Sequence, residues 1–356
     1  MSKSVYRIIG LMSGTSLDGL DIAYCIFEKN NKNWSYKIHS SETYQYPEEW
    51  DKKLRNIHNS SAYEFALANT EYGYFLAEKV KEFISVKRLS DVDLISSHGH
   101  TIFHQPEKSF TFQLGSGAAI AGRSGVATVS DLRSLDVALN GQGAPLVPIG
   151  DALLFPDYEY CLNLGGIANI SFDQKGKRIA FDICPANLAL NHLSKKLKKD
   201  YDTGGQLARS GSLNITLLEK LNGIDFYKSS VAKSLGREWI EEIFFPVLNS
   251  FEISVADKLN TTCEHIALLI AKHAGNKDAK MLITGGGAYN TYLTERIKFH
   301  SLAQVLIPDK QTIEFKEALI FAFLGLLRFE QNINTLASVT GAEINSIGGA
   351  VYLGRN

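Results

Sequence analysis

Two stretches in opposite halves of the chain share one pattern, in which an apolar run, a turn of small residues and a second apolar run follow one another. The first covers residues 8–23 and the second residues 160–171. Each stretch predicts a strand, a tight turn and another strand, because short apolar runs separated by glycine-rich breaks are typical of hairpins. Their positions at the head of each half indicate a duplicated α/β plan, although few residues are identical between them.

The chain length favours two domains. At 356 residues the chain is longer than a single hydrophobic core usually serves. Residues 141–148, Gly-Gln-Gly-Ala-Pro-Leu-Val-Pro, break any regular element and are typical of a boundary. We therefore expect domains at residues 1–145 and 146–340, with a ligand cleft between them.

Hydrophobic periodicity predicts the other main elements. A helical stretch is expected to begin after Pro47. The remaining predicted strands cover residues 34–46, 93–97, 111–114, 126–129, 178–181 and 281–284, and the remaining helices cover residues 61–86, 234–251, 254–274 and 312–330.

Composition excludes several classes of protein. The chain has 37 basic and 38 acidic residues, for a net charge of -1, which argues against a broad nucleic-acid surface. It has no apolar run of about 20 residues and no signal-peptide pattern, so we expect a cytoplasmic protein without membrane association. Its four cysteines lack metal-ligand spacing, so we expect buried, reduced thiols: Cys25, Cys161, Cys184 and Cys263.

The turn of the first hairpin carries groups that suit a phosphate. Gly10, Gly14 and Gly19 allow backbone amides to approach an anion closely. Hydroxyls and carboxylates accompany these glycines: Ser13, Thr15, Ser16, Asp18 and Asp21. The hydroxyls can donate hydrogen bonds, and the two carboxylates can hold Mg²⁺ through its water ligands, because this ion keeps much of its hydration. An ordinary tight hairpin is the alternative interpretation.

The second half offers two further glycine turns. Gly165 and Gly166, with Asn169 nearby, would present a second set of amides to a polyphosphate, although Gly-Gly is also a common hairpin turn. Gly285, Gly286 and Gly287 follow a predicted strand and precede Asn290 at the start of a helix. This second turn would let a nucleotide lie against bare backbone, although strand-to-helix turns often need glycine anyway. The chain lacks the strings typical of P-loop and dinucleotide-binding proteins.

Asp182 is the candidate catalytic carboxylate. The pattern places it at the end of a strand, just before Pro185, which can open a helix. From the residues alone, a general base and a cap for that helix are equally good interpretations.

The string Gly-Leu-Met-Ser-Gly-Thr-Ser-Leu-Asp-Gly-Leu-Asp at residues 10–21 closely resembles the N-terminal signature of anhydro-N-acetylmuramic acid kinases. Similar motifs follow along nearly the whole chain. The family belongs to the actin, sugar-kinase and chaperone ATPase superfamily. The resemblance implies an α/β fold of two actin-like (ribonuclease H-like) domains, with ATP and substrate in the cleft between them. It also implies that residues 341–356 cross back to the first domain.

The resemblance further implies the reaction and its residues. Such an enzyme uses ATP and Mg²⁺ to open 1,6-anhydro-N-acetylmuramic acid with water and to phosphorylate O6, as part of peptidoglycan recycling and amino sugar metabolism. Asp182 corresponds to the catalytic base. The family's sugar pocket corresponds to His98, Arg133, Gln142 and Glu317. Arg133 suits a lactyl carboxylate because its planar fork can bind both oxygens, whereas His98 and Glu317 have ordinary structural alternatives.

The sequence departs from the family pattern close to Asp182. Ile183, Cys184 and Ala186 replace a hydroxyl and two glycines, Asn191 replaces an acid, and His100 replaces the glutamine of a His-Gly-Gln-Thr motif. A kinase of another 1,6-anhydrosugar and a catalytically weak ATP-binding regulatory protein are therefore the alternatives. A homodimer is a further expectation.

Overall fold

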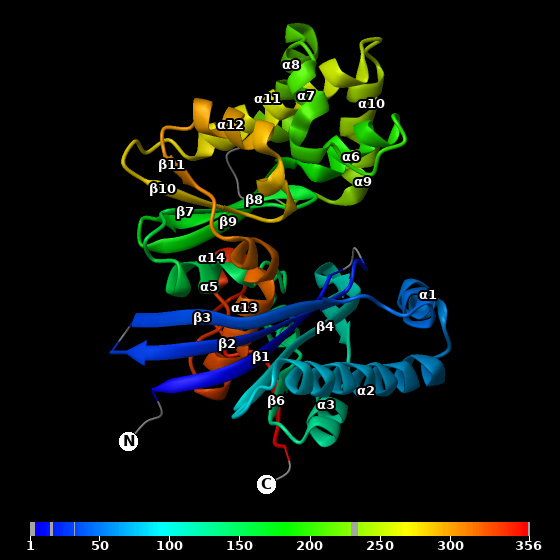
Figure 1. Cartoon of the computed structure of the whole chain (residues 1–356), viewed down its shortest axis with the longest axis vertical. Coiled ribbons are helices and arrows are strands. Elements are labelled where there is room, and N and C mark those ends of the chain that lie inside the picture. The colour runs from blue at the N-terminus through cyan, green and yellow to red at the C-terminus, as the bar shows by residue number, and fades with distance from the viewer. Residues whose placement is uncertain (1–3, 15–16, 32, 229–233, 355–356) are drawn as a thin grey trace. The chain divides into compact units, whose positions relative to one another are not determined.

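The computed structural model describes residues 4–14, 17–31, 33–228 and 234–354. The chain divides into two compact units, which Figure 1 shows. Unit 1 consists of Met1–Phe155 and Phe315–Asn356, and unit 2 of Pro156–Glu314.

These bounds differ from the expected domains at both crossings, the two points where the chain passes from one unit to the other. The first crossing follows helix α5 (Val147–Leu154) instead of preceding it, because α5 packs on strand β3 (Asn33–Tyr44) of unit 1. The return crossing lies inside helix α13 (Lys310–Phe329) and not near residue 341. Most of α13 belongs to unit 1 because it packs on that unit's sheet.

Unit 1 is built on a seven-stranded sheet in the order β12-β6-β4-β1-β2-β3, with β5 paired to β4. Its other strands are β1 (Val5–Ser13), β2 (Leu20–Asn30), β4 (Leu94–Gln105), β5 (Phe110–Leu114), β6 (Thr128–Ser130) and β12 (Ala350–Tyr352). Its other helices are α1 (Glu48–Asn56), α2 (Ala62–Lys87), α3 (Gly117–Ser124), α4 (Ser134–Ala138) and α14 (Ala337–Thr340).

Unit 2 is built on a five-stranded sheet in the order β11-β10-β7-β8-β9. The strands are β7 (Tyr160–Leu164), β8 (Ile167–Gln174), β9 (Lys177–Pro185), β10 (Lys280–Thr284) and β11 (Gln304–Leu306). The helices are α6 (Asn187–Lys195), α7 (Gln206–Ser210), α8 (Ile215–Asn222), α9 (Arg237–Trp239), α10 (Phe245–Asn249), α11 (Val255–His273) and α12 (Thr291–His300). A single π-helical turn, Ile240–Phe244, joins α9 to α10.

Five strands of each sheet share one topology, and β5 and β12 are additions to the unit 1 sheet. In each unit an antiparallel three-stranded meander is followed by two parallel strands on the side of its first strand, β4 and β6 in unit 1 and β10 and β11 in unit 2. This is the strand order of a ribonuclease H-like domain. The predicted duplicated α/β plan is therefore confirmed.

Each sheet buries its own hydrophobic core. In unit 1, Ile9 and Leu11 of β1 pack with Tyr72 and Leu76 of α2, while Gly10 points to the opposite face. A Cβ at Gly10 would lie 2.1 Å from the carbonyl oxygen of Ala318 in α13. Gly10 therefore serves close packing of a helix on the sheet, which corrects its interpretation as a phosphate-binding glycine.

Two strands continue beyond their predicted ends. Strand β4 includes the His-Gly-His-Thr stretch at residues 98–101, because these residues pair with β5 and β1. Strand β9 includes Asp182 and ends only at Pro185, so this proline does not open the next helix. The four cysteines are all buried and none forms a disulfide, as predicted.

A search of the described helices finds none with the length and apolarity needed to cross a membrane.

Candidate functional site

The first hairpin is tied to the interior of unit 1 by hydrogen bonds at Ser13. The Ser13 Oγ lies 2.6 Å from the Tyr46 Oη and 2.7 Å from the His100 Nδ1, and the Tyr46 Oη lies 2.8 Å from the Tyr72 Oη. Burial lowers the pKa of His100 to about 4, so the ring is neutral at pH 7. The Ser13 hydroxyl thus has two partners inside the unit and anchors the end of β1. The predicted donors Thr15 and Ser16 lie outside the described residues.

The acidic side of this hairpin has one anchored and one open carboxylate. The Asp21 Oδ1 accepts a 2.5 Å hydrogen bond from the Thr43 Oγ1, whereas Asp18 is exposed. Gly19 has φ +146°, and a Cβ there would lie 2.7 Å from the Thr43 Cγ2. Among the described residues no group of three or more His, Cys, Asp or Glu side chains is arranged to hold a metal ion. Two carboxylates fit an ion that is held mainly by phosphate oxygens and water.

His98 and Arg133 form a direct pair in unit 1. Arg133 donates from Nε and Nη2 to the His98 Nε2 at 3.1 and 2.9 Å, and from Nη1 to the Gly143 carbonyl at 2.6 Å. The His98 Nδ1 lies 2.8 Å from the Gly99 carbonyl. Burial, and next the charge of Arg133, keep the pKa of His98 well below its usual range, so His98 is a neutral acceptor.

Arg133 keeps donors for a ligand. A guanidinium has five N–H groups, and the three contacts above use three of them. Burial lowers the pKa of Arg133 to about 10, against the opposing charges of Glu317 and Asp136, so it stays charged at neutral pH. Neither acid is within ion-pair distance, 4.0 Å, of Arg133 in the described structure. A partly covered cation without a carboxylate partner suits an anionic ligand.

Asp136 and Thr340 position the loop that holds Arg133, and sequence reasoning missed both. The Asp136 Oδ2 accepts from the Gly143 amide at 2.8 Å, and its Oδ1 accepts from the Thr340 Oγ1 at 2.7 Å. The two partners lie in different parts of the chain, so no local pattern could have paired them. In the same loop, the Gln142 side chain is exposed, as a ligand-contacting group requires.

Glu317 lies near the start of the unit 1 part of α13. Its side chain keeps access to solvent, but many protein atoms surround the carboxylate. The resulting desolvation raises the pKa of Glu317, and the charges of Arg133 and then Lys316 oppose this effect. The preceding Lys316 forms a buried 2.7 Å ion pair with the Asp151 Oδ1, which fixes this turn of the helix on α5.

In unit 2, the hairpin between β7 and β8 presents free amides. The Gly165 and Gly166 carbonyls accept the amides of Asn187 and Leu188, at 3.1 and 3.0 Å. Neither glycine donates its own amide in a turn or loop hydrogen bond between described residues. A Cβ at Gly166 would lie 3.0 Å from the Leu188 Cγ, whereas one at Gly165 would meet nothing closer than 3.4 Å.

The triple glycine packs directly against the end of β7. A Cβ at Gly285, which has φ +81°, would lie 2.4 Å from the Asn163 Oδ1, and one at Gly287 would lie 2.6 Å from the Leu164 Cβ. Gly286 is exposed, and a Cβ there would meet nothing closer than 3.8 Å. The structure therefore brings together the two glycine turns that the sequence predicts for phosphate and adenosine.

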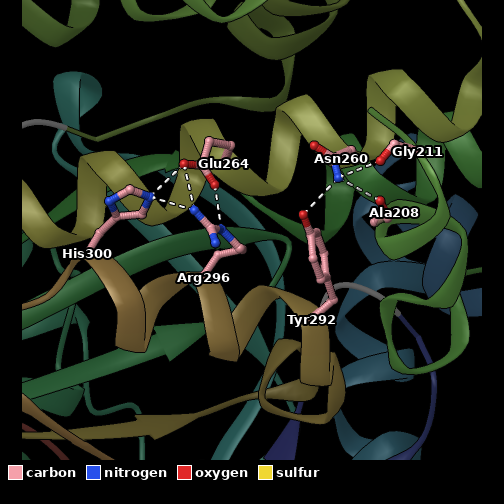
Figure 2. Close-up of polar contacts among 7 residues, drawn as sticks. All are labelled: Ala208, Gly211, Asn260, Glu264, Tyr292, Arg296 and His300. Atoms are coloured by element: carbon pink, nitrogen blue, oxygen red, sulfur yellow. Dashed lines mark hydrogen bonds and ion pairs between the residues drawn. The ribbon is translucent and has the colours of Figure 1, made fainter. Parts of the chain in front are cut away.

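Asn290 has a structural function in the described chain. Its Oδ1 accepts the Leu293 amide at 3.0 Å and so caps α12. Figure 2 shows how α11 holds this helix: the Asn260 Nδ2 reaches the Tyr292 Oη at 2.7 Å, and Glu264 binds Arg296 through 2.6 and 3.0 Å contacts.

Glu264 also contacts His300 at 2.5 Å. Desolvation alone would raise the pKa of Glu264, but the bonds to Arg296 and His300 outweigh it and lower this pKa. This buried network fixes the helix that follows the triple glycine.

A row of polar residues crosses the unit 2 sheet. Asn163 on β7 pairs with Thr284 on β10 and with Asn169 on β8, and Asn169 pairs with Asp182 on β9. Residues that pair in register point to the same face. Leu162, Leu164, Ala168 and Ile170 alternate with these residues and belong to the helix-covered core. The polar row therefore lies on the opposite face.

The two carboxylate oxygens of Asp182 have different surroundings. Its Oδ2 accepts from the Leu235 amide at 2.8 Å and from the Ser234 Oγ at 3.3 Å, and its Oδ1 has no hydrogen-bond partner among the described residues. Desolvation raises the pKa of Asp182, against the effect of these two bonds. The helix-cap alternative is excluded, because Ala186 occupies the N-cap of α6 and no side chain caps it. Sequence reasoning missed Ser234 and Leu235.

The unusual residues after Asp182 do not adopt the left-handed conformation that favours glycine. Neither Cys184 nor Ala186 is among the residues with positive φ, and Ala186 has φ -116° and ψ -99°. Ile183, Cys184 and Ala186 are buried in the unit 2 core.

Comparison with known proteins identifies the family. A model of the family "Anhydro-N-acetylmuramic acid kinase" matches residues 6–354. The protein of that name from Francisella tularensis subsp. novicida is 33% identical and covers 99% of both chains. The one from Caldanaerobacter subterraneus subsp. tengcongensis is 32% identical over 99% of this chain and 98% of its own, and the one from Vibrio cholerae serotype O1 is 33% identical over 97% of each.

Among solved structures, the activator of the 2-hydroxyisocaproyl-CoA dehydratase from Clostridium difficile aligns over 91% of this chain and 96% of its own, with a TM-score of 0.45 and 13% identity. That likeness is too distant to add to the assignment, which rests on the full-length sequence matches. The chain belongs to the anhydro-N-acetylmuramic acid kinase family.

Proposed function

We propose that this protein is an ATP-dependent kinase that opens 1,6-anhydro-N-acetylmuramic acid with water and phosphorylates O6. The products are N-acetylmuramic acid 6-phosphate and ADP, and the setting is peptidoglycan recycling in the cytoplasm. Family membership supports the substrate. The observation that carries the chemistry is the Asp182 carboxylate, with Oδ2 held by two hydrogen bonds and Oδ1 without a hydrogen-bond partner among the described residues.

Asp182 is proposed as the general base. The water oxygen bonds to the anomeric carbon as the bond between that carbon and O6 breaks, and O6 takes the γ-phosphoryl group of ATP. The water gives its proton to Asp182. The Leu235 amide and the Ser234 hydroxyl hold Oδ2 and thereby direct Oδ1 to the water. A positioned base of this kind contributes about 10²- to 10⁴-fold to a rate.

Residues of unit 1 are proposed to recognise the sugar. The free N–H groups of Arg133 would bind the lactyl carboxylate, with His98 and the Gly143 carbonyl fixing the guanidinium plane. Gln142 and Glu317, whose side chains are accessible, would contact the sugar hydroxyl and amide groups.

Both units are proposed to contact ATP. Gly14 and Gly19 of the first hairpin and Gly165 and Gly166 of the second would bind phosphate oxygens through their amides. Gly286 and Gly287 would lie against the adenosine. Asp18 and Asp21 would hold the waters of Mg²⁺, which neutralises phosphate charge when bound.

The test is Asp182→Asn, which keeps the shape of the side chain but cannot accept the proton. We expect calorimetry to show unchanged sugar and nucleotide binding, while the rate of N-acetylmuramic acid 6-phosphate formation, followed by mass spectrometry, falls at least about 10²-fold. The matched control is Asp173→Asn, an exposed acid on the neighbouring strand β8. A rate for Asp182→Asn within a few-fold of wild type would remove Asp182 from the mechanism.

A further inference from the structure

A dense run of lysines lies outside the groups used above. Residues 194–200 read Ser-Lys-Lys-Leu-Lys-Lys-Asp at the C-terminal end of α6. The exposed members of this run need no special explanation, because lysines on a surface are ordinarily solvated. Lys196 differs from them, because its Nζ donates to the Asn249 Oδ1 at the end of α10 and is held in place.

Lys258 is the buried counterpart of Lys196. It lies in the second turn of α11 and is only 6% exposed. Its Nζ makes no ion pair or hydrogen bond with any of the described residues. The covered part is the aliphatic stem: the Nζ is not among the buried polar atoms without a partner, so the ammonium group keeps contact with solvent and is open to a ligand.

His192 brings an imidazole ring to the same place. The ring stacks on Phe245 of α10 at 3.9 Å and 15°, and its Nε2 is buried without a hydrogen-bond partner among the described residues. Helix α6, which carries His192, packs against α11, which carries Lys258. Three helices therefore converge on Lys196, Lys258, His192 and the side chain of Asn249.

The electrostatics around this cluster are positive. Desolvation and then the charge of Lys196 lower the pKa of His192, a hydrogen bond with the Asn249 side chain opposes them, and the charges of Lys195 and Lys258 lower it further. Desolvation and then Lys196 likewise lower the pKa of Lys258. The nearby acid Asp257 has its Oδ1 engaged by the Ser212 amide at 2.6 Å. No described carboxylate lies within ion-pair distance, 4.0 Å, of Lys196, Lys258 or His192.

We propose that Lys196, Lys258, His192 and Asn249 form a binding site for a small phosphate dianion on unit 2. The two ammonium groups would supply charge and the Asn249 amide N–H groups would supply directed hydrogen bonds, while the covered His192 ring would pack beside them. A compact phosphate or phosphate monoester fits better than a nucleic acid, because Lys258 is covered and the net charge of the chain is only -1. This site does not depend on the proposed kinase activity.

The test is calorimetric titration of the full-length protein with inorganic phosphate at constant ionic strength. Lys258→Met keeps the aliphatic stem without the charge, and Lys196→Ala removes an exposed charge and so leaves the fold intact. We expect wild type to bind phosphate, and each variant to bind it at least about tenfold more weakly. The matched control, Lys199→Ala, removes an exposed lysine of the same run and should stay within twofold of wild type.

The same titration identifies the source of the dianion. N-acetylglucosamine 6-phosphate and AMP carry the same group on a sugar and on a nucleoside. The one whose affinity falls in Lys196→Ala as phosphate affinity does names the class of natural ligand. Equal phosphate affinity in wild type and Lys196→Ala would overturn the site, as would an equal loss in Lys199→Ala. Binding to phosphatidylserine vesicles without binding to phosphate would also overturn it.

Discussion

At the scale of single residues, the important contacts join positions far apart in the chain. Asp182 was evident from its local pattern, but its partners Ser234 and Leu235 lie on a segment that reaches it only in the folded unit. Asp136 and Thr340, which together position the Arg133 loop, are likewise remote from one another. A sequence shows which side chains have useful chemistry. It does not show which neighbours tune them, because tertiary packing selects those neighbours.

The pH dependence of activity tests the contact between Ser234 and Asp182. A base must be ionised, so kcat/KM should fall as the pH drops through the pKa of Asp182, at a higher pH than for an ordinary aspartate because burial raises this pKa. Ser234→Ala removes a hydrogen bond that favours the carboxylate. We expect it to move the acid limb upward by about half a pH unit.

The control for this experiment is Ser250→Ala, which removes an exposed hydroxyl bonded only to the Val247 carbonyl in the described chain. It should leave the profile unchanged. An acid limb that stays in place in Ser234→Ala would show that the contact does not tune the base.

At the scale of elements, the two hairpins and the long helices could be predicted because their apolar periodicity is local. The end of β4 could not, because its His-Gly-His-Thr residues look like a polar loop until β1 and β5 pair with them. The end of β9 was mistaken for the same reason, since Pro185 resembles a helix start. Gly10 was misassigned because the sequence alone does not distinguish a glycine that allows close helix packing from a glycine that binds phosphate.

The triple glycine offers a matched pair of substitutions. A methyl group at Gly286 meets no described atom closer than 3.8 Å, whereas one at Gly287 meets the Leu164 Cβ at 2.6 Å. If the nucleotide lies against this turn, Gly286→Ala should keep the wild-type melting temperature and yet weaken ATP binding about tenfold, measured by calorimetry. Gly287→Ala should lower the melting temperature as well. Unchanged ATP affinity in Gly286→Ala would place the adenosine elsewhere.

At the scale of the whole molecule, the protein is built on two sheets that share a five-strand order, as the paired hairpins indicated. The exact crossings between units could not be predicted, because α5 and α13 join unit 1 through packing that no break in composition marks. Both units also bury neutral histidines. His98 and His100 lie in unit 1, where the pKa of His100 falls to about 4, and His265 lies in unit 2 with its pKa lowered to about 3.

These histidines predict acid sensitivity. Their pKa values are depressed in the folded state, so below about pH 6.5 the unfolded chain binds more protons and the free energy of unfolding decreases. The depressed pKa of His100 alone should make the free energy of unfolding about 2 kcal/mol lower at pH 5 than at pH 7. In urea titrations, His100→Gln should lose less stability over this range than wild type, while the exposed-site control His39→Gln should match wild type. Equal acid sensitivity of His100→Gln and wild type would contradict the buried neutral state.

The most direct test of the proposed function compares two sugars that differ only in the lactyl acid. The protein is incubated with Mg-ATP and either 1,6-anhydro-N-acetylmuramic acid or 1,6-anhydro-N-acetylglucosamine, and phosphorylated product is measured by ³¹P NMR. We predict that kcat/KM for the muramic sugar is higher by about 10²-fold or more, because the other sugar leaves the Arg133 guanidinium without a carboxylate partner. Arg133→Ala should narrow this difference in kcat/KM. Equal rates on both sugars in the wild-type protein would contradict the account.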